Sequence, residues 1–220
     1  MTQPASSTAP LAQISRSALL ENLSIGPRDV YVDARHDGWG HGAELVTEVA
    51  REAGLAGVVG AQVQAFRETS GEEIAVITAA GAYGFLPDTR PVLRLSGQVV
   101  TTKRLRAGEG VSYGYVHRAA SDTRVALVTG GYAQGIVRSL GSQLEVLVAG
   151  ARCPILGRVA MDACVVEIGD LAVADGDEVI FLGDPQRGEP SIAEWQRITG
   201  MSAEELIVQI GNRARREVVA

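Results

Sequence analysis

Four short strings in the sequence contain residue types that can do chemistry. The first, ARHDGWGHG at 34–42, follows a strand-like run and places Arg35, Trp39 and His41 among closely spaced glycines. An arginine can bind a carboxylate through its planar fork of N–H donors. The second string, GEGVSYG at 108–114, contains Tyr113. A tyrosine can move a proton if its phenol faces water and a neighbouring group tunes its pKa from about 10.

The other two strings surround Tyr132 and the pair Met161 and Asp162. TGGYAQG (129–135) is rich in glycine, and GRVAMDA (157–163) interrupts a strand-like run. No helix clearly begins after Tyr132, which favours a loop between strands over a phosphate-binding loop. The turn at Asp162 could direct backbone N–H groups at a carboxylate, or it could be a bulge in which Asp162 bonds to the backbone. Tyr113 could equally be a packed strand tyrosine.

These strings lie on two differently patterned halves of the chain. Before residue 85, strand-like runs at 29–34, 55–60 and 73–79 alternate with helix-like runs at 43–54 and 61–71, after an opening helix at 15–23. A β-α-β-α-β order favours parallel pairing. After residue 90, alternating β-branched runs separated by turn residues predict a compact antiparallel barrel or sandwich. Two capping boxes, Ser191 with Glu194 and Ser202 with Glu205, predict two helices near the end.

Composition excludes several classes of function. The net charge is −6, so a nucleic-acid partner is not expected, because binding phosphates needs a basic surface. The two cysteines form neither a disulfide framework nor a metal signature, and we expect buried thiols and no metal site. No signal peptide or membrane span is visible, which predicts a cytoplasmic protein without a membrane partner. Lys103 is the single lysine among 20 basic residues.

Taken in order, the strings of the second half resemble the C-terminal β-domain of alanine racemases. VSYG, GYAQG, GRVAMDA and GDEVIFLG follow one another as VSYG, GYADG and GRVCMDQ commonly do in that family. The departures are Gln134 for an acid, Ala160 for a cysteine and Ala163 for a glutamine. The final NRARREVVA also lacks the tyrosine that the family uses near its end to bind the cofactor phosphate.

The first half resembles fragments of the barrel that holds pyridoxal phosphate in that family. DARHDGWGHG is similar to the family string VVKADAYGHG, whose lysine forms the Schiff base with the cofactor, and here that position is Arg35. GAYGFLP at 81–87 resembles the closing segment of the barrel, and most of the barrel between is missing. The resemblance makes Arg35, Trp39 and His41 the cofactor-site positions. It makes Tyr113 the proton acid/base position and assigns the substrate contacts to the residues Tyr132, Met161 and Asp162.

The predicted fold is therefore α+β and multi-domain. We expect a disordered tail over 1–13 and a truncated α/β segment over 14–89, a small remnant of a (β/α)8 barrel. An antiparallel β-barrel-like domain with terminal helices is expected over 90–220. A complete (β/α)8 barrel needs about 250 residues, so a closed barrel is not expected.

The resemblance leaves several functions open. Arginine cannot form the Schiff base, so one hypothesis is a degenerate racemase relative without autonomous activity and without bound cofactor. It would act as a binding protein or dimer partner. The alternative is a pyridoxal-phosphate-dependent racemase that interconverts L- and D-alanine, and a third is a sensor in which Arg35 binds a carboxylate. In the family the tyrosine matching Tyr113 serves the partner's site, which implies a homodimer or, less favoured, a heteromer with an intact racemase.

Overall fold

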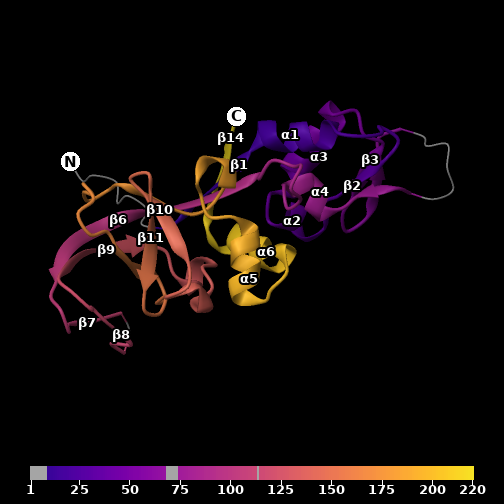
Figure 1. The fold of residues 1–220 in the computed structure, drawn as a ribbon. Coiled ribbons are helices and arrows are strands. Elements are labelled where there is room, and N and C mark those ends of the chain that lie inside the picture. Colours follow the sequence, from indigo (N-terminus) through magenta and orange to yellow (C-terminus); the bar gives the residue numbers. More distant parts are fainter. Residues whose placement is uncertain (1–8, 68–73, 113) are drawn as a thin grey trace, which may run out of the picture.

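The computed structural model describes residues 9–67, 74–112 and 114–220. Its two main parts are an antiparallel barrel and a small α/β unit, with two helices between them (Figure 1). Within the described residues, no helix combines the length and apolar character needed to cross a membrane. The same residues contain no cluster of three or more His, Cys, Asp or Glu side chains that could hold a metal ion.

The C-terminal half forms a closed barrel of six antiparallel strands, as its alternating pattern predicts. Around the barrel these are β13 (Glu178–Leu182), β10 (Glu145–Val148), β11 (Ala151–Leu156), β12 (Ala163–Glu167), β9 (Thr123–Thr129) and β6 (Leu93–Leu105). Pairing of β13 with β6 closes the ring. Alternate residues point inward, and the core includes Val128, Ile155, Val166 and Phe181. Cys153 and Cys164 are free and buried, as expected.

Short strands and helices lie at one end of the barrel, in its loops and after its last strand. Strands β7 (Gly110–Val111) and β8 (His117–Arg118) form a small hairpin at one end (Figure 1). Three single-turn helices, η1 (Tyr132–Gln134), η2 (Arg138–Leu140) and η3 (Pro185–Arg187), lie in its loops. The helices α5 (Ile192–Thr199) and α6 (Ala203–Arg213) begin at the two predicted capping boxes, and both boxes form.

The two chain ends extend the barrel sheet. Strand β1 (Leu11–Ser15) pairs antiparallel with β6, and β14 (Arg215–Val219) pairs parallel with β1 (Figure 1). The disordered tail expected over 1–13 is therefore wrong for residues 11–13. Ala12 and Ile14 are fully buried, because the alternation of LAQIS turns them toward the core while β6 and β14 satisfy the backbone.

The α/β unit contains a four-stranded sheet whose order is β4-β3-β2-β5. Its strands are β2 (Tyr31–Asp33), β3 (Gly57–Val59), β4 (Val63–Ala65) and β5 (Val76–Ile77). Strand β2 pairs parallel with both β3 and β5, as predicted. Its helices are α1 (Arg16–Ser24), α2 (Arg35–Trp39), α3 (Ala43–Glu52) and α4 (Ala79–Tyr83). Ser15 caps α1 by accepting from the Ala18 N–H.

The helix expected over 61–71 is wrong for its first part. Residues 63–65 form β4, which pairs antiparallel with β3, and residues 68–71 lie outside the described residues. All three residues of β4 are exposed, so this part of the run buries no apolar face. Gly57 lets the backbone of Gln64 approach, since a Cβ at Gly57 would lie 2.3 Å from the Gln64 carbonyl oxygen. Pairing with β3 thus overrides the weak helical pattern.

Candidate functional site

The string ARHDGWGHG forms a left-handed turn directly after β2. α2 is not an ordinary α-helix, because φ is +51° at His36, +58° at Asp37 and +51° at Trp39. Non-glycine residues rarely adopt this region, and each costs about 1–2 kcal/mol there. Strained backbone of this kind persists only where surrounding contacts impose it.

Contacts from the C-terminal segment impose this turn. The Asp37 carboxylate accepts from the Ala43 N–H at 2.9 Å and from the guanidinium of Arg216, on β14, at 2.6 Å. Arg216 also donates to the Gly40 carbonyl at 3.2 Å. Burial acts to raise the pKa of Asp37, but the bonds from Ala43 and Arg216 outweigh it and the pKa is lowered. The turn is thus tied to a strand far away in the sequence.

Helix α6 covers the turn through a contact between two glycines. A Cβ added to Gly211 would lie 2.2 Å from the Gly40 carbonyl oxygen, and one added to Gly40 would lie 3.1 Å from the Gly211 Cα. Gly40 has a φ of +82°, which also favours glycine. Both glycines are therefore needed for the backbones of the turn and of α6 to touch.

Arg35, which the resemblance places where the family has its lysine, is held in an ion pair. Its Nε and Nη2 donate to the two oxygens of Asp33 at 2.9 and 2.7 Å, and its backbone N–H donates to the same carboxylate at 3.1 Å. Asp33 is buried, whereas the Arg35 side chain is 55% exposed. Burial raises the pKa of Asp33, but the hydrogen bonds from Arg35 outweigh it, so the pKa is lowered overall. The bidentate fork of Arg35 is therefore already used.

His41 lies behind this pair as a buried, neutral ring. It stacks on Tyr83 with ring centroids 4.3 Å apart, and the Tyr83 hydroxyl donates to the Asp33 carbonyl at 2.7 Å. Burial lowers the pKa of His41 to about 4. The neutral Nδ1–H donates to the Gly38 carbonyl at 2.9 Å, which leaves Nε2 as an acceptor.

Two buried polar atoms of this turn have no hydrogen-bond partner among the described residues. They are His41 Nε2 and Trp39 Nε1. The Trp39 N–H faces the Asp33 carboxylate closely enough to help lower its pKa, although it falls short of hydrogen-bond geometry. The turn thus brings Arg35, Trp39 and His41 together, as the spacing predicts.

A second cluster joins Tyr132, Met161 and Asp162. The N–H of Tyr132 donates to the Ala160 carbonyl at 3.0 Å, and the N–H of Gly130 donates to the Asp162 carbonyl at 2.8 Å. The Gln134 amide donates to the Asp162 carboxylate at 2.8 Å. The turns at 130–135 and 160–162 are therefore fastened face to face, with Met161 55% exposed beside them.

Helix α6 contacts both clusters. A Cβ at Gly135, which ends η1, would lie 2.9 Å from the Cα of Ile210. Arg213 of α6 donates to the Tyr132 carbonyl at 3.3 Å, and the Arg138 guanidinium lies 5.1 Å from the centre of the Tyr132 ring. The same helix touches Gly40 through Gly211, so it connects the two clusters.

Two further residues singled out in the sequence are Tyr113 and Lys103. Tyr113 is outside the described residues, so its expected role stays a prediction. Lys103 lies on β6 opposite Val125 of β9, on the barrel and in neither cluster. Sequence reasoning missed Asp33, Tyr83 and Arg216. The first could have been suspected, because an acid two residues before Arg35 can reach its guanidinium.

The chain belongs to the class of proteins that join an antiparallel β-barrel to an α/β unit. Here the α/β unit has a small mixed sheet and a glycine-rich turn directly after β2. The sequence profile described as "Alanine racemase, C-terminal domain" matches residues 92–218. The chain therefore belongs to the alanine racemase family through that domain.

Individual relatives agree with the profile. Alanine racemase of Mycobacterium tuberculosis (strain ATCC 25618 / H37Rv) is 42% identical over 142 residues, which cover 64% of this chain and 36% of the relative. Alanine racemase of Thermobifida fusca (strain YX) is 40% identical over 131 residues, covering 60% and 35%. The chain spans about a third of the length of the curated relatives it matches, 36% in the first case.

Solved structures show the same fold. Alanine racemase from D-cycloserine-producing Streptomyces lavendulae superposes with a TM-score of 0.86 at 20% identity, covering 100% of this chain and 98% of that chain. The enzyme from Streptomyces coelicolor A3(2) gives 0.85 at 18% identity, covering 97% and 98%. At these identities the likeness concerns the fold alone.

The residues of the turn do not fit the cofactor of the family as a covalent group. A Schiff base needs a neutral amine, and the position holds a guanidinium already paired with Asp33. The only lysine, Lys103, is on the barrel. Trp39 and His41 lie in the same turn, but neither side chain has an amine that could form a Schiff base.

Proposed function

We propose that this chain is an alanine-racemase-family protein without pyridoxal-phosphate-dependent racemase activity of its own, acting as a binding or dimer-partner protein. The observation that carries the proposal is the bidentate pair of Arg35 with Asp33, at 2.9 and 2.7 Å, where the family has its lysine. The pair also argues against a sensor in which Arg35 binds a ligand carboxylate, because its fork is used.

We further infer that residues 14–89 are a truncated remnant of the family's barrel and that 90–220 are its C-terminal domain. Strand β5, the last of the four along the chain, pairs parallel with β2 on the side opposite β3. In a closed (β/α)8 barrel the last strand likewise returns to the first. Strand β4 lies antiparallel beyond β3, where a barrel would continue with its third parallel strand.

The proposal predicts that the purified chain neither racemises alanine nor carries covalent pyridoxal phosphate. The measurement is D-alanine formation, together with absorption spectra with and without added pyridoxal phosphate and borohydride. Lys103→Arg is the matched control, because it removes the single side-chain amine. Robust D-alanine formation, or a visible band that borohydride fixes in the native chain and that is lost in Lys103→Arg, would contradict the proposal.

Restoring the lysine should not restore activity. In Arg35→Lys the new ammonium would face the buried carboxylate of Asp33, and an adjacent opposite charge raises the pKa of an amine. The lysine would therefore stay protonated and would not attack a carbonyl. D-alanine formation by Arg35→Lys above that of the native chain would show that the pair is no obstacle.

The alternative function, pyridoxal-phosphate-dependent alanine racemisation, is favoured by one observation. Tyr132, Met161 and Asp162 are kept and held together by backbone hydrogen bonds, although a purely structural barrel has no need of them. Activity of the native chain in the same assay would select this alternative.

We propose a homodimer formed through the end of the barrel that bears the β7–β8 hairpin. Tyr115 and Val116 in this hairpin are 69% and 58% exposed, and Met161 is 55% exposed. Ser112 fastens the hairpin to the neighbouring turn by accepting from the Arg158 N–H at 2.7 Å. Exposed apolar residues on a fixed surface are typical of an interface, and a two-fold dimer is the commonest closed assembly.

Light scattering tests this association. We expect about twice the chain mass of 23.1 kDa at micromolar concentration, and dissociation in Val116→Glu and Met161→Glu. Ile25→Glu is the control, because Ile25 is also exposed, at 58%, but ends α1 in the other unit. A monomeric native chain would contradict the homodimer and would make a heteromer with an intact racemase the form to examine.

A further inference from the structure

A separate cavity of about 300 Å³ lies between the α/β unit and the barrel. Its walls come from the segment 83–93 and from residues 182–186 after β13. The start of α5 at 191–193 and Ile207 of α6 complete it. Small-molecule pockets in proteins occupy about 300–1,000 Å³, so this cavity accommodates a ligand of modest size. None of the residues in the two clusters described above lines it except Tyr83.

The interior of the cavity is mainly apolar. Tyr83 and Phe85 contribute aromatic rings whose centroids lie 6.4 Å apart and whose planes are tilted by 44°. Aliphatic walls come from Leu93, Leu182 and Ile192. At about 30 Å³ for each water-sized group, the space holds roughly ten such groups. These walls fit a bulky apolar side chain, aromatic or branched.

Two opposite charges lie at the edge of this cavity. Arg90 and Asp184 line it and also line an adjoining hollow, which places both at the boundary between them. Arg90 donates through Nη1 to Glu21 at 2.5 Å, and its Nε and Nη2 have no partner among the described residues. Asp184 accepts from the Gln186 N–H at 2.9 Å through Oδ1, and its Oδ2 is likewise unpaired within the described chain.

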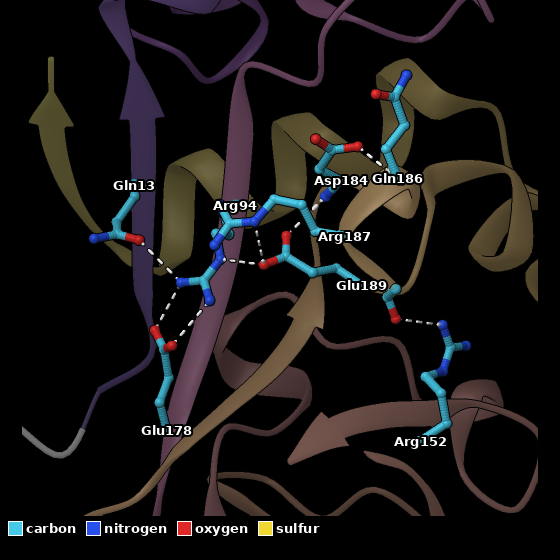
Figure 2. A network of polar contacts seen from close by, with 9 residues as sticks. Gln13, Arg94, Arg152, Glu178, Asp184, Gln186, Arg187 and Glu189 are labelled. Carbon is cyan, nitrogen blue, oxygen red and sulfur yellow. Dashed lines mark hydrogen bonds and ion pairs between the residues drawn. The ribbon is translucent and has the colours of Figure 1, made fainter. Parts of the chain in front are cut away.

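An ion-pair network around the buried Glu189 side chain fixes the segment that carries Asp184 (Figure 2). The Glu189 side chain is 2% exposed and accepts from Arg94 Nε at 2.9 Å and from the Asp184 N–H at 2.8 Å. Arg94 also forms a two-pronged pair with Glu178 at 2.7 and 2.9 Å. Asp184 is therefore fixed before any ligand arrives, which lowers the cost of binding.

We propose that this cavity binds an α-amino acid with a bulky apolar side chain. The ligand carboxylate accepts from the free Nε and Nη2 edge of Arg90, and its ammonium donates to Oδ2 of Asp184. The side chain lies among the aromatic and aliphatic walls. A carboxylate alone would meet the like charge of Asp184, and an amine alone that of Arg90, so a zwitterion matches both groups. This site is independent of the function proposed above, and so is its test.

Isothermal titration calorimetry of the full chain tests the ligand class. L-phenylalanine and L-leucine should bind. Three partial ligands should each bind at least about tenfold more weakly, since a lost charge-assisted bond, or the lost burial of a bulky apolar side chain, costs about one order of magnitude or more. They are 3-phenylpropionate, which lacks the ammonium, phenethylamine, which lacks the carboxylate, and glycine, which lacks the side chain. Absence of binding by both amino acids, or equal binding of the partial ligands, overturns the proposal.

Variants test the location. Arg90→Gln and Asp184→Asn should each weaken L-phenylalanine binding about tenfold, and asparagine can still cap Gln186. Arg106→Gln is the matched control, since Arg106 is exposed directly after β6 and does not line the cavity. Ala193→Trp should abolish binding by filling the mouth from an exposed position on α5. Native-like binding in Arg90→Gln or Ala193→Trp, with circular dichroism unchanged, places the ligand elsewhere and overturns the proposal.

Discussion

The contact between Gly211 and Gly40 offers a sharp test of how the turn after β2 is held. In Gly211→Ala the new Cβ would lie 2.2 Å from the Gly40 carbonyl oxygen and 2.5 Å from its Cα, far inside ordinary contact distance. Both atoms belong to the backbone, so no side-chain rotation can relieve the clash. We expect α6 to move away from the turn.

The size of the effect follows from two opposing contributions. Replacing glycine by alanine inside a helix favours folding by about 1 kcal/mol. Overpacking costs about 1–3 kcal/mol, and the backbone clash places Gly211→Ala at the upper end, so the free energy of unfolding should fall by about 1–2 kcal/mol. Gly81→Ala in α4 is the matched control, because its nearest atom, Ile77 Cγ2, would be 3.4 Å away. That control should gain about 0.5–1 kcal/mol.

Urea unfolding followed by circular dichroism measures both variants, and fluorescence adds a local signal. Trp39 lies in the turn, and Trp195, buried in α5, is the other of the two tryptophans. The native emission of Gly211→Ala should shift to longer wavelength as water reaches Trp39. If Gly211→Ala is as stable as Gly81→Ala and its emission is unchanged, α6 does not fix the turn and the reasoning is refuted.

Two further predictions concern the groups behind the turn. Burial lowers the pKa of His41 to about 4, so between about pH 6.5 and pH 4 the unfolded chain binds a proton that the folded chain does not. The contribution of the neutral ring to stability is therefore complete above about pH 6.5 and is lost as the pH falls toward 4. In urea titrations we expect the free energy of unfolding to drop by about 2 kcal/mol between pH 7 and pH 5. The variant His41→Phe should show a smaller dependence on pH, and a native chain whose stability does not change over this range would contradict the prediction. Tyr83→Phe leaves the Asp33 carbonyl without its donor and should lower the free energy of unfolding by about 1–3 kcal/mol in the same titration; an unchanged free energy of unfolding would contradict this role of the hydroxyl.

The barrel was the most predictable part of the fold, because its signals are local. Alternation along β9 and β12 sets one face inward, and the boxes at Ser191 and Ser202 mark where α5 and α6 begin. Strands β4 and β14 were not predictable in this way. The first is exposed along its length, and the second pairs with a strand about 200 residues earlier in the chain.

The candidate site likewise has features that the sequence predicts and features that it does not. Arg35, Trp39 and His41 come together because they are neighbours in the chain, so their string indicates one turn. The left-handed conformation of that turn was not predictable, because Arg216 and Gly211 impose it from the far end of the sequence. Their residue types carry no local sign of this role. The ion pair with Asp33 was visible only as spacing, and its burial comes from the packing of β2.

The contacts that hold the turn explain how it can persist without a lysine. Its conformation depends on the bond of Asp37 with Arg216, on the approach of Gly40 to Gly211, and on the stacking of His41 with Tyr83. Arg35 takes part in none of them, because its side chain points to Asp33 and is half exposed. The contacts that hold the turn therefore do not depend on which side chain stands at position 35. The remaining GWGHG string is required by α6 and β14 whether or not a cofactor binds, and it cannot by itself be taken as a sign of racemase activity.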